Sequence, residues 1–202
     1  MALKLTKNEL RNQQTRLSQF QKYLPTLQLK KAMLQFEVSV AQMELSRLME
    51  EVKLVRHQVE DFAPLLVEKI AVNLTLYADI LYVKKRYENI AGVEIPIFES
   101  LVFKDANYAL FDSPIWTDRA TEILRSFAIT REKVNIAEEK KRALEKELRS
   151  VSIRVNLFEK ILIPRSLENI KKIRIFLSDQ QLSLVAQAKV AKKKIAEKKA
   201  AS

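Results

Sequence analysis

A heptad repeat over the first sixty residues constrains the fold more than any other feature of this chain. Counted in sevens from Leu3 and from Thr6 up to Phe62, 15 of the 18 positions are apolar, against ten of the other 42 positions in that stretch. A sustained period of 3.5 residues is typical of a helix that packs along its length in a coiled coil. At 1.5 Å per residue, a helix of about 55 residues is about 80 Å long, more than a compact domain of this size needs.

A second apolar repeat follows a cluster of Asp, Ser and Pro at residues 112–114, which is typical of a helix start. Its heptad rows run from Trp116 to Ala191, and we predict a second helix that extends to about Ala196. Past Pro164 the repeat resumes one residue late, and an extra residue in a heptad changes the local winding of a coil.

Each repeat needs a partner helix to cover its apolar stripe, and a chain that folds back on itself supplies both. We therefore predict a mainly α fold with a long antiparallel two-helix coiled coil. Its two helices are residues 1–62 and residues 115–202, and the second ends in a basic tail. Residues 63–114 form a short middle region.

Two prolines fall inside the predicted helices. A proline in a helix interior costs about 3 kcal/mol or more, because it removes a hydrogen bond and clashes with the preceding turn. If the two ends of the coil lie level, Pro164 faces about residue 34, close to Pro25 and to Lys31, which interrupts the first heptad row. We predict that Pro25, Lys31 and Pro164 bend both helices in one zone.

The middle region is richer in β-branched and aromatic residues. "LYVKKRYENI" and "EIPIFESLVF", at residues 81–90 and 94–103, have the composition of strands, and they meet near Gly92, the only glycine in the chain. We predict a β-hairpin here, and a buried helical segment from Pro64 to Tyr77.

The net charge of +11 is concentrated outside the middle region, and "KVAKKKIAEKK" at residues 189–199 holds six lysines against one glutamate. A basic tail can bind nucleic acid. A tail without interleaved aromatic residues is more typical of a solvated helix end or of a protein partner. A basic coiled coil that binds nucleic acid or acts as a scaffold is the alternative interpretation.

The motifs of an enzyme are missing from the sequence. A single glycine cannot form a G-x-x-x-x-G-K-[ST] or G-x-G-x-x-G loop. Cysteine is absent, and His57, the one histidine, has no nucleophile beside it on its helix. We expect no catalytic residue, no cofactor and no metal site. We also expect no signal peptide or membrane span, because no run of about 18 apolar residues is present.

Several stretches, in chain order, resemble the D subunit of V-type and A-type ATPases. "LTKNELRNQQTRL" resembles the family's P-T-K-x-x-L start, and "NIAGVEIPIFE" resembles its N-x-x-G-V-x-x-P segment. "RVNLFEKILIPRSLENIKKI" resembles its R-V-N-A-L-E-x-x-x-I-P hallmark, and "AKVAKKKI" its L-K-x-x-K-x-K-I close. The residues that match the two central motifs are Asn89, Gly92, Val93, Pro96, Arg154, Val155, Asn156, Glu159, Ile163 and Pro164.

The chain departs from the family pattern in three places. Leu5 replaces the opening proline, and Leu157 with Phe158 replaces Ala-Leu in the hallmark. Pro25 stands where many relatives have a plain charged helix, and this feature is closest to the bacterial branch of the family.

The resemblance implies a non-catalytic central-stalk rotor of a rotary ATPase or ATP synthase. Such a rotor couples ATP synthesis or hydrolysis in a catalytic ring to proton or sodium-ion transport. An F-type γ subunit has a similar coil but inserts a larger α/β domain than the about 50 residues found here.

The implied partners are the catalytic and regulatory nucleotide-binding ring subunits, a small central-stalk subunit (F), and a funnel-shaped subunit on the membrane ring. The implied location is cytoplasmic, peripheral to the membrane within the complex. Because both termini of family members lie inside the ring, the predicted ring contacts are Thr6, Lys7, Lys189, Lys192, Lys193 and Lys194.

Overall fold

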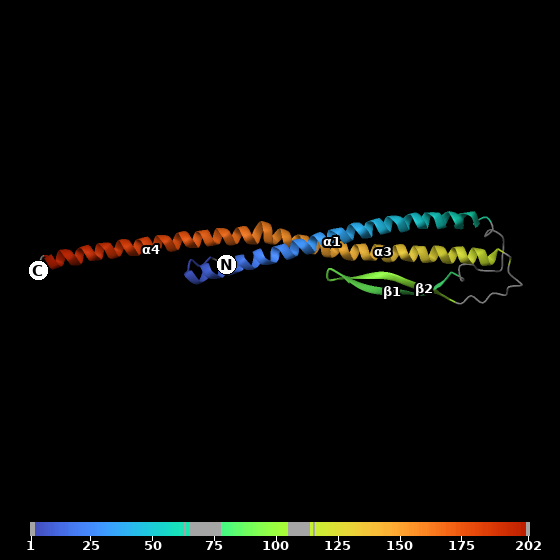
Figure 1. Ribbon diagram of the computed structural model, residues 1–202, viewed down its shortest axis with the longest axis horizontal. Helices are drawn as coiled ribbons and strands as arrows, with labels where there is room; N and C mark the ends of the chain where they lie inside the picture. Colours follow the sequence, from blue (N-terminus) through green and yellow to red (C-terminus); the bar gives the residue numbers. More distant parts are fainter. Residues whose placement is uncertain (1–2, 63, 65–77, 105–113, 115, 201–202) are drawn as a thin grey trace. The chain divides into compact units, whose positions relative to one another are not determined.

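Two long helical stretches and a small hairpin make up the described chain (Figure 1). The computed structural model describes residues 3–62, 64, 78–104, 114 and 116–200. The elements are α1 (Lys7–Phe62), β1 (Ile80–Ile90), β2 (Val93–Phe103), α3 (Thr117–Leu157), the π-helical segment η2 (Phe158–Leu162) and α4 (Ile163–Ala200). The predicted mainly α fold is confirmed, with two long helices packed against each other and an antiparallel hairpin in the middle.

The chain divides into two compact units. Residues 1–29 and 151–202 form the first unit, here called the terminal unit, and residues 30–150 form the second, the central unit. The division by sequence into residues 1–62, 63–114 and 115–202 follows the course of the chain instead, and it stays a prediction.

A threonine side chain caps the start of α1. Thr6 Oγ1 accepts a hydrogen bond from the N–H of Glu9 at 3.3 Å, and the Thr6 carbonyl accepts one from the N–H of Leu10 at 3.0 Å. The Thr6 hydroxyl thus satisfies one of the unpaired N–H groups at the helix start. The helix continues through Pro25 to Phe62, so the single long helix predicted from the first heptad repeat is confirmed.

The seam of the central unit is apolar, as the heptads predict. Leu34, Ala41, Leu45 and Leu48 of α1 are buried, and Leu144 of α3 is 0% exposed. Each occupies a predicted heptad position, and Leu45 and Leu48 of α1 pack with Ala137 of α3, which runs beside α1 in Figure 1. Burying a leucine side chain contributes about 1.5–3 kcal/mol, so this seam is the main source of stability here.

Ion pairs between the two helices flank that seam. Lys30 Nζ lies 2.8 Å from Glu147 Oε1, and Lys140 Nζ lies 2.8 Å from Glu44 Oε2. Both pairs join α1 to α3, so they favour one antiparallel alignment of the helices, although half-exposed pairs contribute only about 0–1 kcal/mol each.

The predicted β-hairpin is confirmed, with strands one residue longer at one end than expected. Its two-residue turn places Ala91 at φ 51° and Gly92 at φ 81°, and Asn89 Oδ1 accepts a hydrogen bond from the Gly92 N–H at 2.9 Å. Positive φ at both central residues is the geometry of a type I′ turn, which matches the twist of the strands. The helical segment predicted from Pro64 to Tyr77 lies outside the described residues apart from Pro64.

The hairpin is held against α3 by polar and apolar contacts. Lys85 Nζ lies 2.6 Å from Glu139 Oε2, and the Lys133 ammonium lies 5.8 Å from the centre of the Phe98 ring. Ile95 is fully buried. The hairpin is therefore part of the core of the central unit.

The extra residue in the second repeat is present as η2. The N–H of Ile163 donates to the carbonyl of Phe158, five residues earlier, in place of the usual four. Beyond η2 the buried positions are Ser166, Ile170 and Ile173, each one residue later than the heptads upstream would place them. A π segment adds one residue without turning the flanking helices out of alignment, so the predicted change in winding is confirmed.

The predicted alignment of the two helices, that is, which residues lie opposite each other, is wrong. Coil ends that lay level would place Phe20 opposite residue 178, but the Phe20 ring lies against Phe158, with centroids 5.3 Å apart. Leu162 and Arg165, on either side of Pro164, lie near Gln13 and Arg16 instead of residue 34. The difference is 20 residues, or about three heptads. A heptad pattern matches equally well after a shift by whole heptads, so it cannot fix this level.

Candidate functional site: the uncovered end of α4

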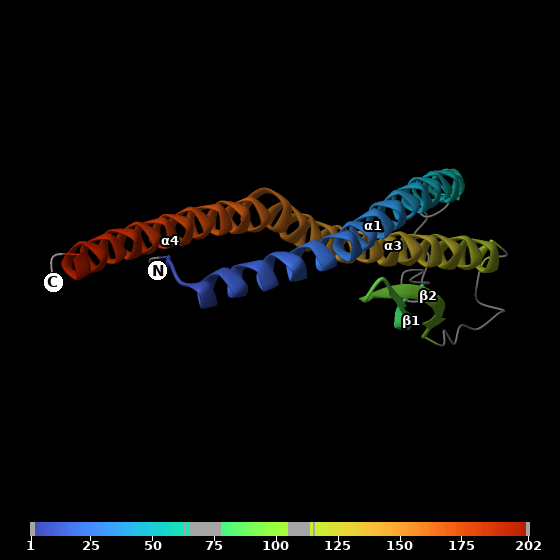
Figure 2. The same ribbon diagram turned by 60° about the vertical axis from the view of Figure 1, so that its left-hand side comes forward.

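No described residue of the terminal unit covers the last part of α4. Because of the shifted alignment, α4 extends beyond the N-terminal end of α1 (Figures 1 and 2). Every residue from 178 to 197 is exposed. Large apolar side chains are among them, with Leu182 67% and Leu184 64% exposed. We call residues 178–197 the uncovered end of α4.

The uncovered end continues the face that packs in the coil. Ile170 and Ile173 are buried, and Leu184 and Ala191 follow Ile170 at intervals of two and three heptads. Residues seven apart lie on one side of a helix. One apolar stripe thus runs the length of α4, and only its first part is covered within the described chain.

Residues 182–191 carry apolar side chains on most sides of the helix. Seven of these ten residues are Leu, Val or Ala. Successive residues turn by about 100° on a helix, so Leu184, Val185 and Val190 face three different directions. Apolar side chains on so many sides of a helix are normally buried, and these are exposed in the isolated chain.

One of the predicted lysine contacts, Lys189, lies near the end of this segment, and the others follow directly after it. Lys189, Lys192, Lys193 and Lys194 are all exposed. Lys193 Nζ lies 3.9 Å from Glu197 Oε1, a long and solvated pair, and the other three form no ion pair with the described residues. The cluster therefore presents a basic surface at the end of α4.

Thr6 and Lys7 lie at a different level of the coil from the lysine cluster. Their neighbours Lys4 and Glu9 lie beside Asn169. Lys189 is 20 residues further along α4, which is about 30 Å at 1.5 Å per residue. The structure thus places the six predicted ring contacts in two separate groups, and the Thr6 hydroxyl is used to cap α1.

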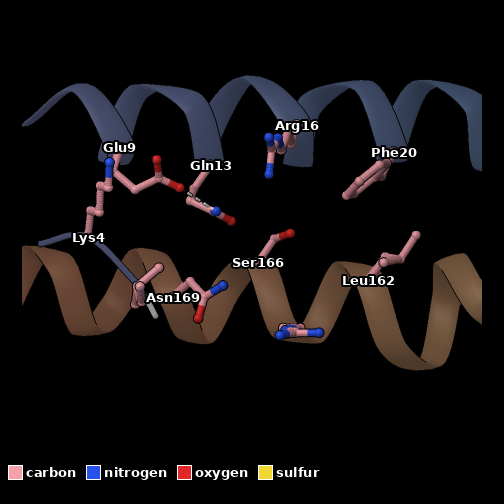
Figure 3. Close-up of a pocket in the computed structure, with 10 residues that line it drawn as sticks. Lys4, Glu9, Gln13, Arg16, Phe20, Leu162, Ser166 and Asn169 are labelled. Carbon is pink, nitrogen blue, oxygen red and sulfur yellow. Dashed lines mark hydrogen bonds between the residues drawn. The ribbon is translucent and has the colours of Figure 1, made fainter. Parts of the chain in front are cut away.

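A polar hollow lies between the two helices of the terminal unit (Figure 3). Its volume is about 480 Å³. Gln13 and Arg16 point from α1 towards α4, and Ser166 and Asn169 point from α4 towards α1. Gln13 Nε2 donates to Glu9 Oε1 at 2.8 Å. The lining residues are Leu3, Lys4, Glu9, Gln13, Arg16, Phe20, Leu162, Arg165, Ser166 and Asn169.

Sequence reasoning missed this hollow, although a signal was present. Gln13 occupies a seam position of the first repeat, and Ser166 occupies one of the repeat as shifted by η2. Both side chains are buried, at 7% and 6% exposed. Two polar residues at seam positions of opposite helices could have predicted a polar layer in the coil.

The motifs that carry the family resemblance lie at the irregular points of the backbone. Gly92 lies in the positive-φ turn and donates its N–H to Asn89 Oδ1, and Pro96, opposite Tyr87 in the hairpin, is buried. The second motif, residues 154–164, includes η2 and ends at Pro164. Both motifs therefore coincide with local geometry that a regular helix or strand cannot provide.

The described residues show no cluster suited to metal chemistry. Among them, no three His, Asp or Glu side chains gather closely enough to hold a metal ion. None of the helices in the described part of the chain is long and apolar enough to cross a membrane.

A coiled coil with an uncovered, apolar and basic end defines a class of protein that acts through other chains. The sequence comparisons identify the family. The family model for the D subunit of ATP synthase matches residues 9–193. The chain therefore belongs to the family of V-type ATP synthase D subunits, which are stalk subunits of rotary ATPases. This assignment does not favour the nucleic-acid or scaffold alternative.

Relatives match almost the whole chain. The V-type ATP synthase D subunit of Chlamydia caviae is 45% identical over 202 residues, which cover 98% of this chain and 95% of the relative. The Chlamydia trachomatis serovar L2 protein is 43% identical over 204 residues, with 98% of both chains covered. The Chlamydia pneumoniae protein is 39% identical over 199 residues, with 98% and 95% covered.

Proposed function

We propose that the chain turns as the central rotor of its complex, with the uncovered end of α4 inside a ring of catalytic and regulatory nucleotide-binding subunits. By turning there it couples ATP synthesis or hydrolysis to the transport of protons or sodium ions. The family supplies the stalk role, and the uncovered end supplies a surface suited to contact with a surrounding ring.

The apolar segment of residues 182–191 is the observation that carries this proposal. Exposing Leu182, Leu184 and Val190 to water on three sides is unfavourable, because each buried CH₂ group gains about 0.8 kcal/mol. A single partner helix would cover only one side. A sleeve formed by several subunits would cover them all.

Rotation can act on the ring only if the faces of the rotor differ. Around residues 189–194 the lysine side chains are unevenly placed, since Lys192, Lys193 and Lys194 are consecutive and span about 200° of the helix. Each catalytic interface would then meet a different charge pattern, and a differential interaction with open and closed states shifts their populations.

The lysines also suit a moving contact. Lysine carries a compact, well-hydrated charge on a flexible stem, and solvated ion pairs contribute only about 0–1 kcal/mol. Contacts of Lys189, Lys192, Lys193 and Lys194 with the ring would thus be easily exchanged during rotation. Thr6 and Lys7 would contact the ring at the level of Asn169.

Curvature of the rotor is part of the same proposal. Pro25, Lys31 and Pro164 remain the candidates for bends that make the rotor eccentric, each at its own level of the coil. Pro164→Ala should reduce ATP-driven ion transport relative to ATP hydrolysis in the reconstituted complex. An unchanged ratio would exclude Pro164 from this role.

The remaining partners would bind the central unit. They are the small central-stalk subunit (F) and the funnel-shaped subunit on the membrane ring, which would keep the chain in the cytoplasm and peripheral to the membrane. An affinity tag inserted beside Asn107 should co-purify two large nucleotide-binding subunits and one small subunit from native membranes. Recovery of nucleic acid or of a homodimer alone would contradict these partners.

Site-specific photo-crosslinking tests the position of the uncovered end. A photoreactive residue at Leu184 should crosslink the intact complex to the large ring subunits. The matched control is Tyr82 on β1, which is 54% exposed and should not crosslink to them. Equal crosslinking from both positions, or none from Leu184 in an active complex, would overturn the proposal.

A further inference from the structure

The charged side chains around the polar hollow are not balanced. Lys4, Arg16 and Arg165 line it together with one carboxylate, Glu9. The three cations form no ion pair with any residue in the described part of the chain. Glu9 is already engaged, because its Oε1 accepts the hydrogen bond from Gln13.

In the central unit, two lysines beside the seam are paired with carboxylates. There, Lys30 and Lys140 each meet a carboxylate of the opposite helix at 2.8 Å. In the hollow, α1 and α4 each bring an arginine to the same space, and no carboxylate in the described part of the chain pairs with either of them. Lys4, Arg16 and Arg165 are exposed at the rim of the hollow, and there they gather positive charge that the described part of the chain leaves unpaired.

The floor of the hollow supplies neutral donors. Ser166 is 6% exposed, and its hydroxyl forms no hydrogen bond with the described residues. Asn169 points into the same space (Figure 3). The Ser166 hydroxyl and the Asn169 amide can both donate to an acceptor from outside the chain.

We propose that the hollow binds a small oxyanion of the phosphate class between Arg16 and Arg165. Guanidinium groups bind phosphate oxygens through two parallel N–H donors. The Ser166 O–H and the Asn169 amide N–H donate to the remaining oxygens, and Lys4 adds charge at the rim. A volume of about 480 Å³ leaves room for a second phosphoryl group or for water. The bound anion links α1 to α4 and stabilises the terminal unit.

Inorganic phosphate and pyrophosphate are the probes for a test on the full-length chain. Each is titrated at constant ionic strength against chloride, and the arginine Nε–H signals are followed by NMR. We expect saturable binding with one site per chain. Arg16→Gln and Arg165→Gln should each weaken binding about tenfold, which corresponds to about 1.4 kcal/mol.

Two further variants separate a built site from general charge attraction. Arg174→Gln removes the same charge from an exposed position nine residues along α4, about half a turn away from Arg165 in direction, and it should leave binding unchanged. Glu9→Gln removes the one opposing charge and should tighten binding severalfold. Circular dichroism checks that every variant keeps its helix content.

The outcomes that overturn the proposal are equally specific. A response that does not saturate, or that chloride reproduces at the same ionic strength, means that the hollow has no site. Equal weakening by Arg165→Gln and Arg174→Gln means that net charge alone attracts the anion. Because the isolated chain is used, these results are independent of whether the chain turns inside a ring.

Discussion

The central and terminal units are built from the same heptad pattern, yet the residues that fill and cover the seam differ between them. In the central unit, leucines fill the seam, ion pairs close its edges and a hairpin packs on α3. In the terminal unit the seam contains Gln13 and Ser166, begins beside a π segment and then continues on α4 with nothing over it in the described chain.

This difference separates two uses of one pattern. A seam that is filled and closed supplies the free energy of folding. A seam that is polar and then uncovered supplies little, but leaves α4 available for other chains. Changes in the central unit should therefore lower stability, and changes at the uncovered end should affect assembly and activity.

Single-residue deletions should give the largest contrast between the regions. Deleting exposed Lys146 from α3 turns the following seam by about 100° and should cost more than the about 2–5 kcal/mol of one large cavity. Deleting Lys160 from η2, together with Pro164→Ala, removes the extra residue and leaves a regular helix, because a π segment is one inserted residue.

Circular dichroism with urea unfolding measures both deletions. We expect the Lys146 deletion to unfold the chain largely, and the Lys160 deletion with Pro164→Ala to keep its helix content. Similar losses of stability in the two variants would mean that η2 is needed for folding, against this account.

Truncating one leucine in the buried seam and one at the uncovered end of α4 should give the next largest difference in stability. Leu144→Ala removes a side chain that is 0% exposed and should lower the free energy of unfolding by about 2–5 kcal/mol. Leu184→Ala changes a residue that is 64% exposed and should stay within about 0.5 kcal/mol. Urea unfolding of the purified chain measures both, and a reversed order would contradict the division of roles.

The hairpin turn offers a pair of substitutions with opposite signs. Gly92→Val places a β-branched side chain at φ 81° and should destabilise by about 1–3 kcal/mol. Ala91→Gly relieves a residue held at φ 51° and should be neutral or slightly stabilising. Thermal unfolding compares the two; destabilisation by Ala91→Gly as large as that by Gly92→Val would argue against a strained type I′ turn.

The Lys85–Glu139 pair should have the smallest effect, and it should depend on pH. The hydrogen bond from Lys85 to Glu139 raises the lysine pKa above its usual 10.5. The raised pKa means that the folded state favours the protonated amine. This contribution, up to about 1 kcal/mol for an exposed pair, is complete below pH about 10.4 and is lost as the pH rises through the folded-state pKa.

Comparison of wild type with Glu139→Gln isolates this contribution from other lysines. The difference in free energy of unfolding should be constant from about pH 7 to 9 and should shrink above that range. A difference that persists unchanged at high pH would mean that the pair contributes through packing instead of charge.

Much of this architecture could be predicted from sequence because its signals are local. The heptads of α1, the strands around Gly92 and the late restart beyond Pro164 each depend on residues close together in the chain. The alignment of α1 with α4 is not local. A repeat of seven matches itself after every shift of seven, so only particular contacts such as Phe20 with Phe158 select the level.

The candidate site was predictable in part for the same reason. The lysines of residues 189–194 are visible in the sequence, but the exposure of Leu182 and Leu184 follows from the alignment, which the repeat left open. The hollow at Gln13 and Ser166 depends on that alignment and on η2 together.

Amide hydrogen exchange of the isolated chain and of the assembled ATPase complex tests the central claim most directly. In the isolated chain, residues 178–197 have no packed neighbour among the described residues and should exchange fast, whereas the α1 and α3 seam around Leu45 and Leu144 should exchange slowly. Assembly should protect residues 178–197 strongly and change the seam little. Equal exchange of residues 178–197 in both states would show that no subunit covers this end, and it would contradict the account.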